Sequence, residues 1–429
     1  MSTLKVNKLR DTSGSTDAIT LDPNGGAVLA GVTTISTARI TTGITTSIQV
    51  GGGVTISESG IEASGIGITC ANINGAQIGG RRNIVINGAM EVAQRGITST
   101  SDGIHTVDRF KMGYGGENEV LTQAQVDVSS GTSPYTEGFR KAFKITNGNQ
   151  TGGLGAGDYF QLKYTIEAQD IAKSGWNYTS SSSFITLSFW IKSSVAQNFY
   201  GYLKSQDGTF KRYVFETASL SANTWTKVVK TVPGNAGITF NNDTGEGLIL
   251  ELIYFAGTDE TGSVSLNSWA TFVGSSRTPD NTATWWTTND ATLEVTGVQL
   301  EVGSQATPFE HRSFGEELQL CSRYFQKIDG GSNSLFATGF TAGNDFYGGS
   351  MLPMGKMRAA PTIAVDGTLS HLNYTHVAVS ANASSITNQG SGDSSFVLRL
   401  QSTTNTTSNA GAYARIVNSS TNLTFAAEL

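Results

Sequence analysis

Residues Leu293–Ile328 read LEVTGVQLEVGSQATPFEHRSFGEELQLCSRYFQKI, and this stretch divides the chain into its parts. It begins as a predicted strand, because apolar residues alternate with polar ones around a glycine, at Leu293, Val295, Val298 and Leu300. Beyond a loop, Ser313 and Glu316 have the spacing of a capping box, in which each side chain bonds the other's backbone amide. Apolar residues then recur at helical spacing, at Phe314, Leu318, Cys321 and Phe325. The stretch therefore predicts one linking helix, over about residues 313–328, between two strand-rich regions.

The composition favours a β-rich protein over a disordered one. Of the 429 residues 14% are charged and 38% are hydrophobic, and glycine occurs 51 times. An ordinary globular protein has about 25% charged residues. The N-terminus lacks the apolar core of a secretory signal, and Cys70 and Cys321 are too far apart to indicate a disulfide framework. We expect both cysteines to be buried, in a protein made in the cytoplasm that works outside a cell.

Charge and hydropathy argue against two kinds of partner. The net charge is −6, and no run of five or more Lys or Arg offers a footprint for nucleic acid. No apolar run approaches the roughly 18 residues of a membrane span. We therefore expect no nucleic-acid partner and no membrane insertion.

Sequence motifs at three places resemble one family. They are GVQLEVG and TPFEHRSFGEELQLCSRYFQK in the stretch above, NIVINGAMEVAQRG at 83–96 followed by DRF at 108–110, and MRAAPT at 357–362 with the terminal FAAEL. This set resembles cyanophage-like bacteriophage tail fibres and receptor-binding proteins, over residues 82–429. The resemblance implies a carbohydrate-binding-module-like β-sandwich followed by a C-terminal tip domain.

The resemblance also implies a role and partners. It implies a structural virion protein, assembled in the host cytoplasm, whose N-terminus binds a tail adaptor or tail tube protein. Its host-facing end would bind a cell-surface glycan or protein. A structural calcium ion is implied by the same analogy, although no ligands can be named for it. No other cofactor and no metal-ligating residues are expected.

Residues 27–80 predict a homotrimeric β-shaft. Isolated Ile and Val residues recur between Thr and Ser, which favour extended backbone, and Gly, which breaks it into short strands. One such chain cannot bury these side chains against itself, whereas three copies around a common axis can. The predicted axis residues are Ile35, Ile40, Ile44, Ile48, Ile56, Ile61 and Ile66. A flexible linker is the alternative, and the polar arm at 1–26 is either a frayed terminus or the virion-attachment strand.

The rest of the chain predicts two β domains. Short alternating strands separated by turn residues over 81–311 are typical of a sandwich. Residues 312–329 form the link, and 330–429 predict a small tip domain. One strand alternates so that a single face holds Ile185, Leu187, Phe189 and Ile191. The predicted fold class is mainly β: an extended trimeric β-shaft, a jelly-roll-like β-sandwich, one linking helix and a C-terminal small β-sandwich.

The candidate sites are aromatic, because no catalytic motif is present. The four histidines fit no zinc spacing, and there is no GxSxG or phosphate-loop pattern. Sugar binding needs an exposed aromatic face beside hydrogen-bonding groups. The adjacent Trp285 and Trp286 would point to opposite faces of a strand, one into the core and one into solvent. Further candidates, each with a core position as the alternative, are Trp176, Tyr178, Trp269, Phe346, Tyr347 and Tyr374.

These observations favour a non-enzymatic, trimeric tail fibre that binds a host receptor during adsorption. Two alternatives stay open, a head fibre or capsid decoration protein and a tailspike-type polysaccharide depolymerase. A depolymerase needs two carboxylates about 5 to 9.5 Å apart, and the candidates are Asp158, Glu167, Asp259 and Glu260. The run Glu310–Arg312 resembles a catalytic cluster, but in the resembled family it belongs to the framework, so we expect a hydrogen-bonded join there.

Overall fold

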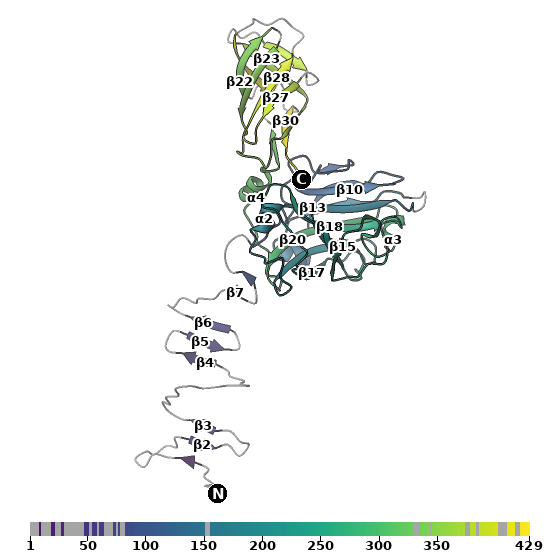
Figure 1. Ribbon diagram of the computed structural model, residues 1–429, viewed down its shortest axis with the longest axis vertical. Helices are drawn as coiled ribbons and strands as arrows, with labels where there is room; N and C mark the ends of the chain where they lie inside the picture. Colours follow the sequence, from purple (N-terminus) through teal and green to yellow (C-terminus); the bar gives the residue numbers. More distant parts are fainter. Residues whose placement is uncertain are drawn as a thin grey trace. The chain divides into compact units, whose positions relative to one another are not determined.

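The computed structural model describes residues 82–429 except 151–154, 330–334, 344, 374–377, 383–385, 402–409 and 417–420, together with short strands before residue 82 (Figure 1). The chain divides into two compact units, Met1–Cys70 and Ala71–Leu429. The first unit contains two antiparallel three-stranded sheets: β1 (Lys8–Leu9), β2 (Ile19–Leu21) and β3 (Ala27–Leu29), then β4 (Ser47–Val50), β5 (Val54–Ser57) and β6 (Gly60–Ala63). The second unit opens with the hairpin of β7 (Asn72–Ile73) and β8 (Ala76–Gln77).

Three of the predicted axis residues occupy one row of a described sheet. Ile48 of β4 pairs with Ile56 of β5, which pairs with Ile61 of β6. The other predicted axis positions, Ile35, Ile40, Ile44 and Ile66, and the cysteine Cys70 lie outside the described residues. The trimeric shaft stays a prediction.

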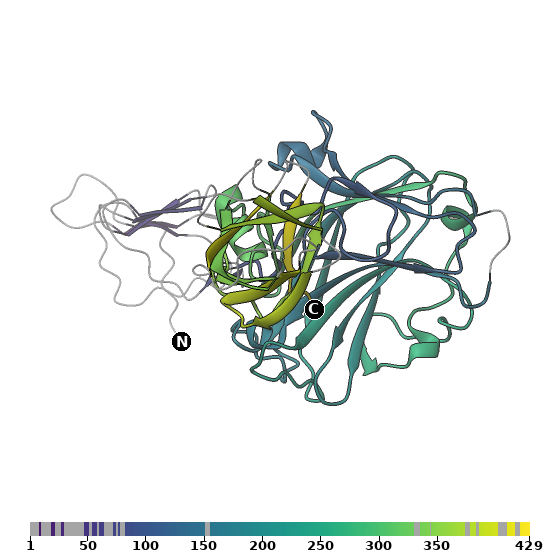
Figure 2. The same ribbon diagram turned by 90° about the horizontal axis from the view of Figure 1, so that it is seen from above.

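Two six-stranded antiparallel sheets form a β-sandwich in the second unit (Figures 1 and 2). The first, called here the β18 sheet, has the order β10 (Phe110–Gly115), β13 (Tyr159–Glu167), β18 (Glu246–Ala256), β15 (Tyr200–Ser205), β16 (Lys211–Glu216) and β19 (Trp269–Thr271). The second, the β20 sheet, has the order β17 (Thr226–Pro233), β14 (Phe184–Ser193), β20 (Thr292–Val302), β12 (Lys141–Thr146), β11 (Thr122–Asp127) and β9 (Thr98–Ser99).

Strand β14 confirms the predicted alternation and shows that both of its faces are covered. Ile185, Leu187, Phe189 and Ile191 all belong to the core between the two sheets. The opposite face is buried as well, since Trp190 is 8% exposed and packs in a second apolar cluster with Phe139 and Val128. The sequence pattern alone did not predict this second layer.

The linking helix is shorter than predicted. Helix α4 covers Phe314–Cys321, and the capping box between Ser313 and Glu316 is present as expected. The chain then forms β21 (Phe325–Ile328), which pairs with the C-terminal strand β30 (Asn422–Ala426). Pairing with a distant strand decides the conformation after Cys321 against the helical spacing, because local preference yields to tertiary contacts.

Helix α4 is also not alone in the described part of the chain. Three short helices accompany it, α1 (Ser133–Thr136), α2 (Ala168–Ala172) and α3 (Thr284–Thr287), with the 3₁₀ turn η1 (Gly274–Ser276). All lie in connections between strands, so the fold remains mainly β as predicted.

The C-terminal domain is a second, smaller pair of sheets. One has the order β21, β30, β24 (Thr362–Asp366). The other has seven strands in the order β26 (Ala378–Asn382), β25 (Thr368–Asn373), β29 (Gly411–Ile416), β22 (Leu335–Ala342), β23 (Asp345–Met351), β28 (Ser395–Gln401) and β27 (Ile386–Ser391). Their shared core includes Phe346, Leu398 and Phe425.

The last residues of the chain contact the sandwich. The Glu428 carboxylate pairs with Arg95 Nη2 at 3.0 Å and with Arg109 Nη1 at 2.5 Å. Arg109 is 2% exposed, has a φ of +75°, and its guanidinium carbon lies 3.4 Å from the centre of the Tyr324 ring. The DRF sequence at 108–110 thus serves the contact between the two domains.

Candidate functional site

A groove lies on the outer face of the β18 sheet, away from the core. It encloses about 300 Å³. The residues that line it are Lys111, Gly113, Gln161, Lys163, Tyr202, Lys204, Glu251, Phe272 and Arg277. We call it the outer groove.

The register of the β18 sheet brings the groove residues together. Lys111 of β10 pairs with Lys163 of β13, which pairs with Glu251 of β18, which pairs with Tyr202 of β15. Side chains of directly paired residues lie side by side on one face. Because successive residues point to opposite faces, the intervening apolar residues enter the core; these are Met112, Leu162, Leu252 and Leu203.

One end of the groove is closed by the segment 257–280. Phe272 of this segment packs in an apolar cluster with Tyr202, Val214 and Ile253 on the outer face of the sheet. The buried Arg212 holds the segment in place, since its Nη1 donates to the carbonyls of Val273, at 3.3 Å, and Ser276. The segment therefore gives the groove an aromatic wall.

The groove combines charged, amide and aromatic groups. The Tyr202 hydroxyl donates to the Glu251 carboxylate, and burial together with this negative charge raises the pKa of Tyr202 well above its ordinary value. Lys204 Nζ lies 4.4 Å from the centre of the Phe272 ring, and burial lowers the pKa of its ammonium. Gln161 Oε1 is buried and has no hydrogen-bond partner among the described residues.

Gly113 adds to the room in the groove. A Cβ at this position would lie 3.4 Å from Gln161 Cγ and Nε2. Any larger residue would therefore fill space beside the Gln161 amide. The missing side chain leaves room beside the amide nitrogen of Gln161, and the same amide carries the unpartnered Oε1. A hydroxyl group of a ligand can bond this amide.

Trp285 and Trp286, the strongest aromatic candidates, are both core residues. The prediction that one of them faces solvent is therefore wrong. Trp285 and Trp286 lie in the helical turn α3 instead of a strand, and both are 0% exposed. Trp285 stacks on Phe160 at 5.7 Å and Trp286 on Phe255 at 5.1 Å. In a helical turn consecutive side chains do not point to opposite sides, and here both enter the sandwich core. Trp176, 3% exposed, is a core residue as well.

The remaining aromatic candidates are scattered. Tyr178 is half-buried and packs on the core, and the half-buried Trp269 donates from Nε1 to the Pro233 carbonyl at 2.6 Å. Phe346 is 0% exposed, so it presents no face to a ligand. Tyr374 lies outside the described residues.

Tyr347 is the tip candidate with an accessible aromatic neighbour. It stacks on Phe340 with ring centres 5.8 Å apart, and Phe340 is 52% exposed. The two rings come from paired residues of β22 and β23. The sequence did not predict Phe340 as a site residue, because only the strand register shows that it lies beside Tyr347.

None of the predicted binding residues lines the outer groove, and the groove residues were not predicted. The signal available in the sequence was the polar half of alternating strands, as in Gln161 and Lys163 between core residues. That signal is weak, because it also describes any solvated face of a sheet. Only strand pairing shows that four such polar faces converge.

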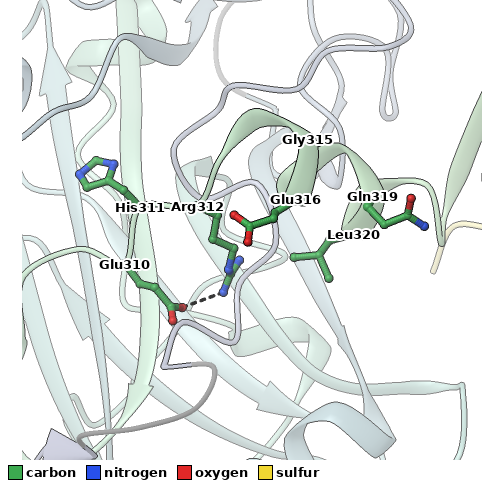
Figure 3. Close-up of a pocket in the computed structure, with 7 residues that line it drawn as sticks. All are labelled: Glu310, His311, Arg312, Gly315, Glu316, Gln319 and Leu320. Atoms are coloured by element: carbon green, nitrogen blue, oxygen red, sulfur yellow. Dashed lines mark hydrogen bonds and ion pairs between the residues drawn. The ribbon is translucent and has the colours of Figure 1, made fainter.

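A second depression surrounds His311, where pockets of about 710, 470 and 210 Å³ adjoin. Figure 3 shows the Glu310 carboxylate directed at Arg312 while His311 points the other way. Glu310 accepts hydrogen bonds from the backbone amides of Asn83, at 2.8 Å, and Arg82, at 3.2 Å, and pairs with Arg312 at 2.9 Å. Arg312 also donates to the Asn83 carbonyl at 2.5 Å. The expected hydrogen-bonded framework at this join is confirmed.

Three of the four carboxylates considered for hydrolysis bind structural partners, and the fourth is exposed. Glu167 binds Arg323, Glu260 pairs with Arg277 at 2.6 Å, and Asp158 accepts from the Gly155 amide at 2.8 Å. Asp259 is exposed. In the described ranges no three His, Cys, Asp or Glu residues are grouped as a metal site, so the calcium ion stays a prediction. No helix there is long and apolar enough to cross a membrane.

Comparisons with known proteins give structural likenesses at low identity. No family model and no curated protein matches the chain. Among solved structures it is similar to the enzymatically active domain of bacteriophage CBA120 tailspike protein 4, with 10% identity over 51% of this chain and 21% of that one, and a TM-score of 0.27. It is also similar to a putative sugar binding protein from Bacteroides thetaiotaomicron (11% identity, 52% of this chain, 100% of that one, TM-score 0.28). A third is the CBM22-1 xylan-binding domain from Paenibacillus barcinonensis Xyn10C (10% identity, 55% and 100%, TM-score 0.26).

Proposed function

We propose that this protein is a trimeric receptor-binding fibre of a bacteriophage tail and that its outer groove binds a glycan of the host surface. The observation that carries the glycan proposal is the groove itself. Phe272 offers an aromatic surface for the C–H face of a sugar, and Gln161 and Lys111 offer partners for its hydroxyls. The unpartnered Gln161 acceptor supports this, because a buried acceptor without a donor costs about 1–3 kcal/mol that a ligand hydroxyl would recover.

The tail-fibre part of the proposal rests on the sequence motifs. The segments at 83–96, 108–110, 297–303 and 307–327 resemble those of phage receptor-binding proteins, and in this fold they form the framework that joins the sandwich to the C-terminal domain. The N-terminal arm would attach to the virion. A trimer would present three grooves at once, which raises the apparent affinity for a repetitive cell surface.

The outer groove contains one carboxylate, and this favours glycan binding over glycan cleavage as its role. Among its lining residues Glu251 is the one carboxylate, and it accepts a hydrogen bond from Tyr202. Glycoside hydrolysis by the usual mechanisms needs a pair of carboxylates that flank the scissile bond. The depolymerase alternative therefore has no pair of acids in this groove.

A binding experiment with the intact chain tests the glycan proposal. The wild-type protein should bind members of a bacterial-polysaccharide panel, and Gln161→Ala should weaken that binding about tenfold, a change of roughly 1.4 kcal/mol. Lys173→Ala, an exposed position outside the groove, is the matched control and should bind as the wild type does. Failure of the wild-type protein to bind any polysaccharide would overturn the proposal, and new reducing ends in the bound polysaccharide would favour the depolymerase.

Immunogold labelling of virions tests the attachment. Label at the tail is expected for a tail fibre. Label on the capsid would favour the head-fibre alternative, with the glycan-binding groove unaffected.

A further inference from the structure

The outer groove carries more positive than negative charge, although the whole chain has a net charge of −6. Its lining includes Lys111, Lys163, Lys204 and Arg277 against the single carboxylate Glu251. A positively charged site on an acidic protein selects negatively charged ligands.

Two of the cations are already neutralised by neighbours. Lys163 Nζ lies 3.0 Å from Glu246 Oε1, and Arg277 Nε lies 2.6 Å from Glu260 Oε2. These pairs fix the two side chains at the rim of the groove. They leave little charge for a ligand.

The other two cations have no carboxylate partner among the described residues. Lys111 is exposed at the edge strand β10, and Lys204 is half-buried against Phe272. Glu251 does not pair with either of them, since the bond described for its carboxylate comes from the Tyr202 hydroxyl. The groove therefore holds two ammonium groups without an ion pair among the described residues, and the nearby Glu251 carboxylate compensates part of the charge of Lys204.

The register places the ammonium of Lys111 beside that of Lys163 on the outer face. Lys111 and Lys163 are directly paired on neighbouring strands, and the ion pair of Lys163 with Glu246 offsets the repulsion between the two ammonium groups. Burial disfavours the charged form of Lys204 and lowers its pKa, and the nearby Glu251 carboxylate offsets part of this effect. An anion placed between Lys111 and Lys204 would favour the charged form of Lys204, because it adds to the effect of Glu251.

We propose that the outer groove selects acidic polysaccharides, with the anionic group of a sugar residue bound by Lys111 and Lys204. This rests on the glycan binding proposed above and names its ligand class. The anion can be the carboxylate of a uronic acid or a sulfate ester, and both present oxygens that an ammonium binds as a point charge. Gln161 Oε1 would accept a hydrogen bond from a neighbouring hydroxyl, and Phe272 would pack on the ring.

The test compares each acidic ligand with its neutralised form on the intact chain. The probes are oligomers of galacturonate, glucuronate and mannuronate beside their methyl esters, and a sulfated galactan beside its desulfated form. We expect at least one acidic oligomer to bind about tenfold more tightly than its neutralised partner, a preference that shrinks as added salt screens the charges. The carboxylate and sulfate arms tell the two sources of negative charge apart.

Two variants link the preference to the groove. Lys111→Gln and Lys204→Gln should each weaken binding of the acidic form about fivefold or more and weaken binding of the neutral form by a smaller factor, while Lys173→Gln should change neither. Lys111 is exposed, so its variant should fold even if that of Lys204 does not. Equal binding of acidic and neutral forms, or neutral binding alone, would overturn the acidic preference and leave glycan binding intact. No binding to any oligosaccharide or polysaccharide would overturn the proposed function itself.

Discussion

Glu167 joins the sandwich to the segment that leads into the C-terminal domain. Its carboxylate is fully buried and binds Arg323 through two contacts, Nε–Oε1 at 2.6 Å and Nη2–Oε2 at 2.8 Å. The Tyr324 hydroxyl donates to Oε1 at 2.6 Å and Gln169 Nε2 to Oε2 at 2.7 Å. Burial alone would raise the pKa of Glu167, but the hydrogen bonds from Arg323 and Tyr324 outweigh it, so the pKa is lowered.

Removing this carboxylate should destabilise the protein strongly. Glu167→Ala leaves Arg323 and Tyr324 without their partner, and breaking a buried pair costs about 3–5 kcal/mol. Chemical denaturation of the variant should show this loss. Asp127→Asn is the control, because Asp127 is 82% exposed and pairs with Lys141 at the surface, where such a pair contributes about 1 kcal/mol or less. Equal effects of the two substitutions would contradict the role given to Glu167.

Asp108 should make stability depend on pH. Burial raises its pKa from 3.8 to about 6, against the opposing charge of Arg95 3.3 Å away. Because the folded-state pKa is the higher one, the protonated acid favours the folded state. This contribution is complete below about pH 4 and is lost as the pH rises through about 6.

The expected size of the pH effect is at most about 3 kcal/mol, at 1.36 kcal/mol per pKa unit. The free energy of unfolding, measured by denaturant titration between pH 4 and pH 7, should fall with rising pH in the wild type. Asp108→Asn has no such titration and should fall less steeply over that range. Parallel pH profiles for the two proteins would refute the raised pKa.

At the scale of elements, strand β20 depends on one glycine. Gly297 has a φ of +65°, and a Cβ there would lie 2.6 Å from Phe139 Cζ. The register with β14 shifts between Ser188 and Trp190, whose partners Gln299 and Thr296 flank this glycine. The glycine within the predicted strand therefore marks a bulge where a side chain has neither conformational freedom nor space.

Gly297→Ala should lower the free energy of unfolding by about 2 kcal/mol or more, from overpacking and the positive φ. Thermal and chemical denaturation measure this loss. Gly274→Ala is the matched control, because a Cβ at Gly274 meets no atom within 4 Å, and its effect should stay within about 0.5 kcal/mol. A neutral Gly297→Ala would mean that Phe139 moves aside freely.

Helix α4 shows how far an element can be predicted. Its start was predictable, because Ser313 and Glu316 act within one turn of the chain. The end of the helix was not predictable, because Phe325 continues the helical spacing of apolar residues and yet lies in strand β21. The pairing of Phe325 with Ala426, about a hundred residues away, decides between them.

At the scale of the whole molecule, the open question is the number of chains. Ile48, Ile56 and Ile61 are paired in one register row across the three-stranded sheet of β4, β5 and β6. A small sheet of short strands needs packing against a further layer for independent stability. Other copies of the chain are the cover that the trimer prediction supplies.

Sedimentation tests this prediction. The full chain of 45.2 kDa should sediment as a trimer, and a chain that begins at Ala71, the start of the second compact unit, should sediment as a monomer. The shorter chain should keep binding of soluble oligosaccharides by the groove and lose at least about a hundredfold in apparent affinity for a polysaccharide-coated surface, because avidity is gone. A monomeric full chain would exclude the shaft.

By itself the sequence determined that the fold is mainly β, where helix α4 begins, and that Ile185, Leu187, Phe189 and Ile191 enter the core. These features follow from alternation and capping, which act over a few residues. The tertiary structure alone decided that Trp285 and Trp286 are buried and that Lys111, Lys163, Glu251 and Tyr202 form one row. Burial and adjacency of this kind arise from pairing between strands far apart in the chain, and strand register is set by the whole sheet, so no local pattern encodes it.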